Sequence, residues 1–253
     1  MHPRIYLSGR VGFEVAGELA ITEREFRGRQ ERVAFAYLVL ERARPVARDE
    51  LANVLWPEER PAAWQTGLSA VVSRLRSLLA REPVAGLPAS MSRGFGQYRL
   101  FLPAGVWVDI EAAANAVDAA EAALRANEPP AAFGPATVAA TIARRPFLSG
   151  DGGGWVARER EVLQRVRVRA LDCLARVWLA AGEPQYAVEA AAEAVGADAL
   201  REASYRLLMQ AHVAAGNRAG AMRSYHDLRE RLVGELGSDP SQETEALYLE
   251  VLG

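Results

Sequence analysis

Lysine is absent from the sequence, and all 30 basic residues of this 253-residue chain are arginines. This absence excludes Walker-type phosphate binding, Schiff-base chemistry and lysine general bases. One cysteine and three histidines are present, so an intramolecular disulfide and a thiolate-cluster metal site are excluded as well. A catalytic or metal-binding histidine cluster is not expected, because His212 and His226 are too far apart in the chain for a ligand motif.

Long apolar runs are also missing. The longest, Val33 to Leu40, has eight residues, whereas a membrane span needs about 20. The N-terminus carries no apolar segment of the kind that a signal peptide contains. We therefore expect a cytoplasmic protein with no membrane contact.

The charge is distributed unevenly along the chain, although the net charge is only −2. Residues 1–102 contain 15 arginines and 11 acidic residues, a net charge of +4, and the remaining residues have a net charge of −6. This asymmetry favours one module for a polyanion and a second module for another partner. The excess of four charges is small, so a chance distribution remains the alternative at this point.

Short strands, helices and a hairpin follow one another in the first 102 residues. Turn residues separate three predicted strands, and the apolar spacing becomes helical from Glu25 onward. The strands are predicted at 5–7, 11–15 and 19–21, the helices at 25–44, 48–56 and 62–81, and a hairpin with a Gly-rich tip at 91–101. This order predicts an α+β winged helix-turn-helix with short N-terminal strands.

The strand signals disappear after Pro103, and an all-α second part is predicted. Pro129-Pro130 is expected to break its first helix, and Ser149–Gly154 is predicted to be a flexible loop. The helices are predicted at 109–127, 136–144, 155–181, 184–196, 200–215 and 218–236, with a last one after Pro240. The change of pattern near Pro103 predicts two domains, residues 1–105 and residues 106–253.

An internal repeat lies within this helical part. Leu174–Gly182 (LARVWLAAG) matches Leu208–Gly216 (LMQAHVAAG) at an offset of 34 residues, and Ala187 and Ala221 keep the same offset. A period of 34 with Ala-Gly at the turn is typical of tetratricopeptide helical hairpins, which present surfaces to other proteins. The fold predicted for the second domain is therefore a tetratricopeptide-like helical repeat.

Motifs for enzymatic chemistry are weak. Gly94-Phe95-Gly96 lies in the hairpin with no helix behind it, which disfavours a nucleotide site. Gly150–Gly154 could bind an anion through backbone N–H groups, but a linker is the favoured interpretation. Cys173 lies on an apolar helix face and is expected to be packed rather than reactive. We predict no catalytic residues, no cofactor and no metal, and hence no enzyme.

The third predicted helix carries the candidate site. Its apolar stripe is expected to face inward, and the remaining face holds short hydrogen-bonding residues and two arginines. Such a face suits a DNA major groove, although an ordinary solvated helix face is the alternative for this helix in isolation. The helix before it and the hairpin after it, with Arg93 at the hairpin tip for a minor groove, favour a winged helix that binds double-stranded DNA. The stripe is Leu68, Val72, Leu75 and Leu79, and the polar face is Gln65, Thr66, Ser69, Ser73, Arg74, Arg76 and Ser77.

Several segments resemble a known family. In the first part the segments are similar to the OmpR-type winged helix, and in the second part to the bacterial transcriptional activator domain. Together and in this order they resemble the Streptomyces antibiotic regulatory protein (SARP; AfsR/DnrI/RedD) family over residues 5 to 252. The segments are Arg48–Leu51, Leu55–Pro57, Val72–Arg76, Gly96–Leu100, Val108–Ile110, Trp155–Arg160 and Leu236–Thr244.

The resemblance implies a nucleoid-associated activator of a specialised pathway, which binds tandem promoter repeats as two protomers side by side and recruits RNA polymerase. It implies that Arg74 contacts bases and Arg76 contacts phosphate. The resemblance further implies that Thr66, Ser69 and Ser73 line the groove and that Arg93 is the wing contact. The alternative function is a protein-interaction adaptor with a degenerate winged helix.

Overall fold

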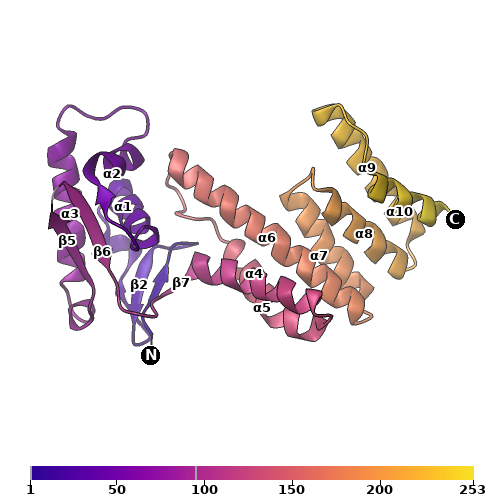
Figure 1. Cartoon of the computed structure of the whole chain (residues 1–253), viewed down its shortest axis with the longest axis horizontal. Coiled ribbons are helices and arrows are strands. Elements are labelled where there is room, and N and C mark those ends of the chain that lie inside the picture. Colours follow the sequence, from indigo (N-terminus) through magenta and orange to yellow (C-terminus); the bar gives the residue numbers. More distant parts are fainter. Residues whose placement is uncertain (1, 95) are drawn as a thin grey trace. The chain divides into compact units, whose positions relative to one another are not determined.

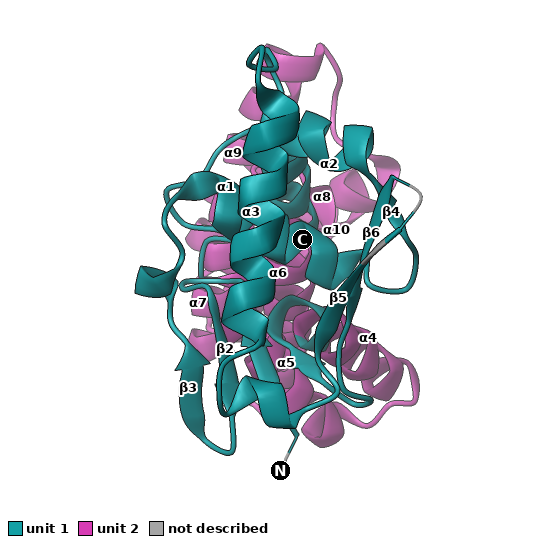
Figure 2. Cartoon of the chain, turned by 90° about the vertical axis from the view of Figure 1, so that its left-hand side faces the viewer, with its two compact units in different colours: residues 1–112, 145–162 teal, residues 113–144, 163–253 magenta. Residues whose placement is uncertain are grey.

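A computed structural model of the chain describes residues 2–94 and 96–253, and for Arg93 the backbone alone. The chain forms two units, residues 1–112 with 145–162 and residues 113–144 with 163–253, coloured separately in Figure 2. Each unit is described here by itself.

A four-stranded sheet opens the first unit. Its strands are β1 (Arg4–Tyr6), β2 (Gly12–Val15), β3 (Glu18–Ile21) and β7 (Trp107–Val108), in the order β3-β2-β1-β7. The first three pair antiparallel, which confirms the three predicted strands, whereas β7 pairs parallel to β1 and was not predicted. Strand β7 therefore lies after the change of pattern near Pro103 and still belongs to the N-terminal sheet.

The remainder of the first unit is the predicted winged helix. Helix α3 contributes the buried Leu68, Val72, Leu75 and Leu79, so its predicted apolar stripe is confirmed. The hairpin is also confirmed, and β4 joins it in a sheet of order β4-β6-β5. The elements are η1 (Glu23–Glu25), α1 (Arg29–Leu40), β4 (Val46–Ala47), α2 (Arg48–Leu55), α3 (Trp64–Leu79), η2 (Val84–Gly86), β5 (Ser90–Gly94) and β6 (Gln97–Phe101).

One buried carboxylate ties the N-terminal sheet to the start of the next helix. Asp109 accepts hydrogen bonds from the backbone N–H groups of Leu7 (2.9 Å) and Ser8 (2.9 Å) and from the Ser8 hydroxyl (2.8 Å). Burial raises the pKa of Asp109 above that of an ordinary aspartate. The loop after β1 therefore depends on a residue that lies beyond the predicted domain boundary.

The segment 145–153 is a second return of the chain to this unit. Asp151 is buried and receives two hydrogen bonds from Arg32, from Nε at 2.9 Å and from Nη2 at 2.7 Å. Arg160 donates to the carbonyls of Phe147, Leu148 and Asp151. The prediction of a flexible linker at Ser149–Gly154 is therefore wrong, because the carboxylate and the backbone carbonyl of Asp151 in this loop bind arginines from α1 and α6.

Helical hairpins make up the second unit. Helices α4 and α6 start within the first unit and continue into the second. Neighbouring helices in the chain lie side by side (Figure 1), and the alanines Ala175, Ala190 and Ala191 allow α6 and α7 to pack closely. The helices are α4 (Asp109–Arg125), α5 (Pro129–Ala143), α6 (Gly154–Ala180), α7 (Pro184–Ala197), α8 (Glu202–Ala214), α9 (Arg218–Leu236) and α10 (Gln242–Leu252).

The start of α5 differs from the prediction. The sequence predicted a break at Pro129-Pro130 and a helix from residue 136, but α5 begins at Pro129. Proline is compatible with the first turn of a helix, because the N–H groups there have no intrahelical partner. The two prolines therefore mark the beginning of a helix rather than a gap between helices.

The turns of three hairpins share one geometry. In each, the backbone N–H at the end of the turn donates to a carbonyl five residues earlier: Glu128 to Ala123, Glu183 to Trp178 and Asn217 to His212. The residue before each donor, Asn127, Gly182 or Gly216, has a positive φ of 60° to 75°. This is the Schellman motif. The predicted two-hairpin repeat is confirmed, and the structure adds a third hairpin, α4–α5, which the sequence period did not reveal.

No helix in the described residues is long and apolar enough to cross a membrane. Cys173 is buried in the second unit, as predicted, and burial raises the pKa of its thiol to about 11.

Candidate nucleic-acid interface

Helix α3 presents a continuous exposed polar face. Thr66, Ser73 and Arg76 are exposed, and Ser69 is half-buried between them. Their spacing of three and four residues keeps them on one side of an ideal helix. The Ser69 hydroxyl donates to the Gln65 carbonyl at 2.8 Å. The structure therefore brings together four of the six residues predicted for the site.

Arg74 does not lie on this polar face. It is half-buried, and its Nη2 donates to the backbone carbonyl of Glu25 at 3.4 Å. Its Nε is buried and has no acceptor among the described residues. One residue step turns an ideal helix by about 100°, so Arg74 lies on the flank of the face that Ser73 occupies. Arg74 is therefore placed beside the polar face and against the turn that precedes α1.

Arg76 lies on the polar face and next to the hairpin. Its Nε donates to the carbonyl of Met91 in β5 at 3.1 Å. Strand β5 continues to Arg93, which pairs in register with Tyr98, but the Arg93 side chain lies outside the described residues. Arg76 therefore joins the polar face of α3 to the first strand of the wing.

Two aromatic contacts hold the beginning of α3. The guanidinium of Arg60 lies 4.7 Å from the ring centroid of Trp64 and forms an ion pair with Asp49 at 2.7 Å. Trp56, which ends α2, lies against Gly67, where an added Cβ would be 3.4 Å from the indole ring. The turn between α2 and α3 is thus packed on both helices, which fixes the orientation of the polar face.

A carboxylate also connects α1 with α2. Glu50 accepts hydrogen bonds from the Tyr37 hydroxyl and from Arg44, both at 2.5 Å. The Arg44 guanidinium lowers the pKa of Glu50 to about 2, and burial together with Glu50 raises the pKa of Tyr37 to about 12. Arg44 is therefore neutralised locally and differs in this respect from the arginines of α3.

The segment of the chain that contains α3 and the wing has a positive net charge. From Arg60 to Val108 the chain contains six arginines and a single acidic residue, Glu82. Arg74 and Arg76 bond backbone carbonyls rather than carboxylates, so these contacts leave their charges unneutralised. Arginines whose charges are not paired with carboxylates favour contact with a polyanion.

Arg48 lies beside the turn of the wing, and it was not among the six site residues predicted from the sequence. It begins α2, directly after β4, and its backbone N–H donates to the carbonyl of Gly96 at the turn of the wing. Its position at the start of a short helix was visible in the sequence, but the pairing of β4 with β6, which brings it to the wing, was not.

In this chain a winged helix is followed along the sequence by helical hairpins. Residues 108–252 match the family described as the bacterial transcriptional activator domain. This match covers more than half of the chain, so the chain belongs to that family. Within it, the chain is a member of the SARP group of regulators.

Two curated relatives support this assignment. The regulatory protein AfsR of Streptomyces coelicolor is 30% identical over 223 residues, which are 88% of this chain and 22% of AfsR. The transcriptional regulatory protein MoaR1 of Mycobacterium tuberculosis is 26% identical over 255 residues, 97% of this chain and 80% of MoaR1. The chain thus spans about a fifth of the length of AfsR. These relatives are named as regulators, not as enzymes.

The same fold is found in Mycobacterium tuberculosis EmbR, whose structure was solved in complex with a low-affinity phosphopeptide. The TM-score is 0.83 at 23% identity, over 99% of this chain and 65% of that chain. The winged helix followed by a tetratricopeptide-like domain is therefore shared by both proteins.

Proposed function

We propose that this chain is a sequence-specific DNA-binding transcriptional activator. The observation that carries the proposal is the exposed polar face of α3 within a stretch of 49 residues that has six arginines and one acidic residue. In this proposal α3 enters the major groove, where Thr66, Ser69 and Ser73 line the base edges. Arg93 in the wing enters the neighbouring minor groove.

The two arginines of α3 have separate roles in the proposal. The resemblance assigns Arg74 to bases and Arg76 to phosphate, but the geometry favours the reverse. Arg76 lies within the polar face, so it is suited to base edges. Arg74 is half-buried on the flank of this face, so it is suited to a phosphate beside the groove.

The test is a salt titration of affinity for a duplex that the protein selects from a random pool and for a scrambled duplex. Arg76→Ala should cost about 1–3 kcal/mol on the selected duplex and reduce the preference between the two duplexes. Arg74→Ala should weaken both alike and reduce the salt slope by about one. Arg125→Ala, an exposed arginine of α4, is the matched control and should change neither quantity.

The opposite pattern for Arg74→Ala and Arg76→Ala would restore the assignment that the resemblance implies. If the wild type shows no preference between the duplexes and neither substitution alters binding, the activator proposal fails. The protein-interaction adaptor with a degenerate winged helix then becomes the better explanation.

We further propose that two protomers bind tandem promoter repeats side by side and recruit RNA polymerase to genes of a specialised biosynthetic pathway. Half-sites on one face of the duplex lie about 10–10.5 bp apart, or a multiple of this spacing. Inserting about half a helical turn between the repeats should abolish cooperative binding in a mobility-shift titration, because the second protomer would face the opposite side. Unchanged cooperativity would contradict side-by-side binding.

A further inference from the structure

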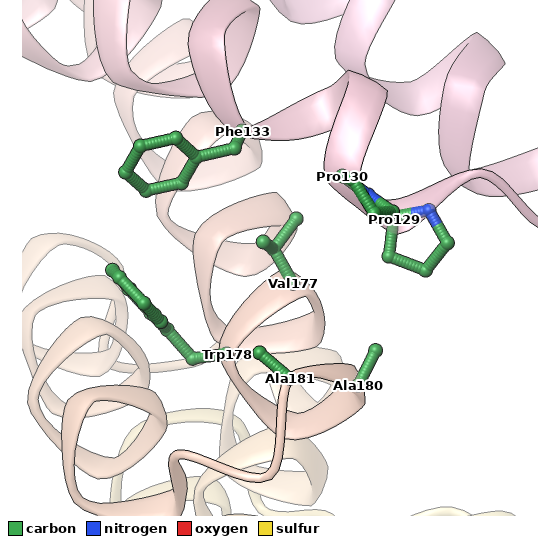
Figure 3. Close-up of a pocket in the computed structure, with 7 residues that line it drawn as sticks. All are labelled: Pro129, Pro130, Phe133, Val177, Trp178, Ala180 and Ala181. Carbon is green, nitrogen blue, oxygen red and sulfur yellow. The ribbon is translucent and has the colours of Figure 1, made fainter.

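An apolar cavity lies between the start of α5 and the end of α6. Its volume is about 460 Å³, within the range of small-molecule sites. Every side chain that lines it is apolar (Figure 3): Pro129, Pro130, Phe133, Val177, Trp178, Ala180 and Ala181.

Aromatic rings gather at this cavity and remain open to solvent. Phe133 meets Trp178 edge to face with ring centroids 5.2 Å apart, and the ring centroid of Tyr186 lies 5.0 Å from that of Trp178. Phe133 is 41% exposed and Tyr186 is 51% exposed. Exposed apolar patches of this kind mark binding sites more often than scattered single residues do.

The hairpin turn itself does not require these rings. The shared hydrogen bond of the three turns makes Trp178 equivalent to Ala123 and His212. By the same alignment Tyr186, three residues after the donor, is equivalent to Ala131 and Gly220. Small or polar residues therefore form the same turn in the two other hairpins. Among the three hairpins, the pair of Trp178 and Tyr186 therefore occurs in the α6–α7 hairpin alone. The cavity opens beside this hairpin.

We propose that this cavity binds an uncharged small molecule with two or three flat rings. The lining offers no charged side chain to neutralise an ionised ligand, and burying an unpaired charge there would be costly. Proline rings and aromatic rings offer flat apolar surfaces, against which ring systems pack well. This inference is independent of the DNA-binding proposal, because all of its residues lie in the second unit.

The probe for the experiment is N-phenyl-1-naphthylamine, an uncharged dye with three rings whose fluorescence rises in apolar sites. The full chain should bind it saturably. Ala181→Phe fills the cavity from an exposed position, and Phe133→Ala removes one wall. Each should weaken binding by about tenfold or more. Val138→Ala, at a residue of α5 that is 47% exposed and does not line the cavity, is the matched control and should leave the affinity unchanged.

A charged analogue tests the chemistry of the ligand. The dye 8-anilino-1-naphthalenesulfonate has the same rings and an added sulfonate, and it should bind about tenfold more weakly. The melting temperature and circular dichroism of each variant establish that it is folded. Absence of saturable binding of the neutral dye, or equal affinities of wild type and the folded Ala181→Phe variant, would overturn the proposal. Equal binding of both dyes would overturn the preference for uncharged ligands.

Discussion

Gly182, Gly216 and Asn127 each allow one helix to end and the next to begin with three residues between them. All three occupy the left-handed region, where a side chain beyond hydrogen is strained unless it can bond locally. No neighbouring atom lies within 4 Å of a Cβ added at Gly182. The requirement for glycine at this position is therefore a property of the backbone alone.

Replacing Gly182 by alanine should lower the free energy of unfolding by about 1–2 kcal/mol, the cost of a left-handed alanine. The matched control is Gly196→Ala, because Gly196 is exposed, lies in the last turn of α7 and also has no atom near an added Cβ. That substitution should be neutral or stabilise by a few tenths of a kcal/mol. Urea denaturation of the wild type and the two variants measures both changes in the free energy of unfolding. Equal effects of the two substitutions would contradict the backbone explanation.

The sequence was least informative about which distant residues contact a given side chain. Helical periodicity placed Arg74 on the polar side of α3, because the period defines the angle of a side chain but not what packs beside it. The turn around Glu25, distant in the sequence, covers that flank. In the same way nothing near Asp151 indicated that Arg32 would bind it. Contacts between residues far apart in the chain leave no periodic signal in the sequence. Such contacts determine the environments of both Arg74 and Asp151.

At the scale of the elements, helix α3 contains one residue with a low intrinsic helix propensity. Gly67 lowers the intrinsic helix propensity, yet it lies where Trp56 packs against the helix. An alanine Cβ there would meet the indole at 3.4 Å, which is ordinary van der Waals contact. The glycine is therefore not required by the space available.

Gly67→Ala should raise the free energy of unfolding by about 0.5–1 kcal/mol, because it reduces the conformational entropy of the unfolded chain and improves helix propensity. Thermal denaturation followed by circular dichroism measures the change. Gly67→Leu is the comparison, since a larger side chain would collide with Trp56 and should destabilise. A loss of stability in the alanine variant would mean that Trp56 cannot adjust by a few tenths of an ångström.

Elements with their own periodicity were predictable from the sequence. The stripe of α3, the hairpin and the hairpins of the repeat all follow from local spacing, and the structure confirms them. The short strands β4 and β7 have two residues each and no period of their own. They exist because distant strands, β6 and β1, supply their hydrogen bonds.

For the whole molecule, the division at residues 105 and 106 remains a prediction that fragments can test. Residues 1–105 lack β7, the Asp109 carboxylate and the loop that carries Asp151. We expect the melting temperature to rise from the fragment 1–105 to 1–144 and again to 1–162. The first step restores Asp109, and the second restores the contacts of Arg29, Arg32 and Arg160.

Near-ultraviolet circular dichroism of the three fragments measures these melting temperatures and reports whether each has a fixed tertiary structure. Equal values for 1–105 and 1–162 would show that residues 1–105 form an independent domain. A rise at the first step alone would assign the stabilisation to Asp109 and β7 rather than to the loop.

The guanidinium of Arg29 donates to the carbonyl of Leu55 at the end of α2 and to that of Gly152 in the returning loop. Two stretches of chain separated by α4 and α5 are therefore parts of one structure. A single crossover between two such genes that falls between α1 and residue 145 would unite an α1 from one parent with a returning loop from the other. A hybrid that keeps these contacts needs a crossover after residue 162, or two crossovers on either side of residues 113–144, or compatible loops in both parents. Recombination should therefore pass the winged helix and residues 145–162 to descendants together.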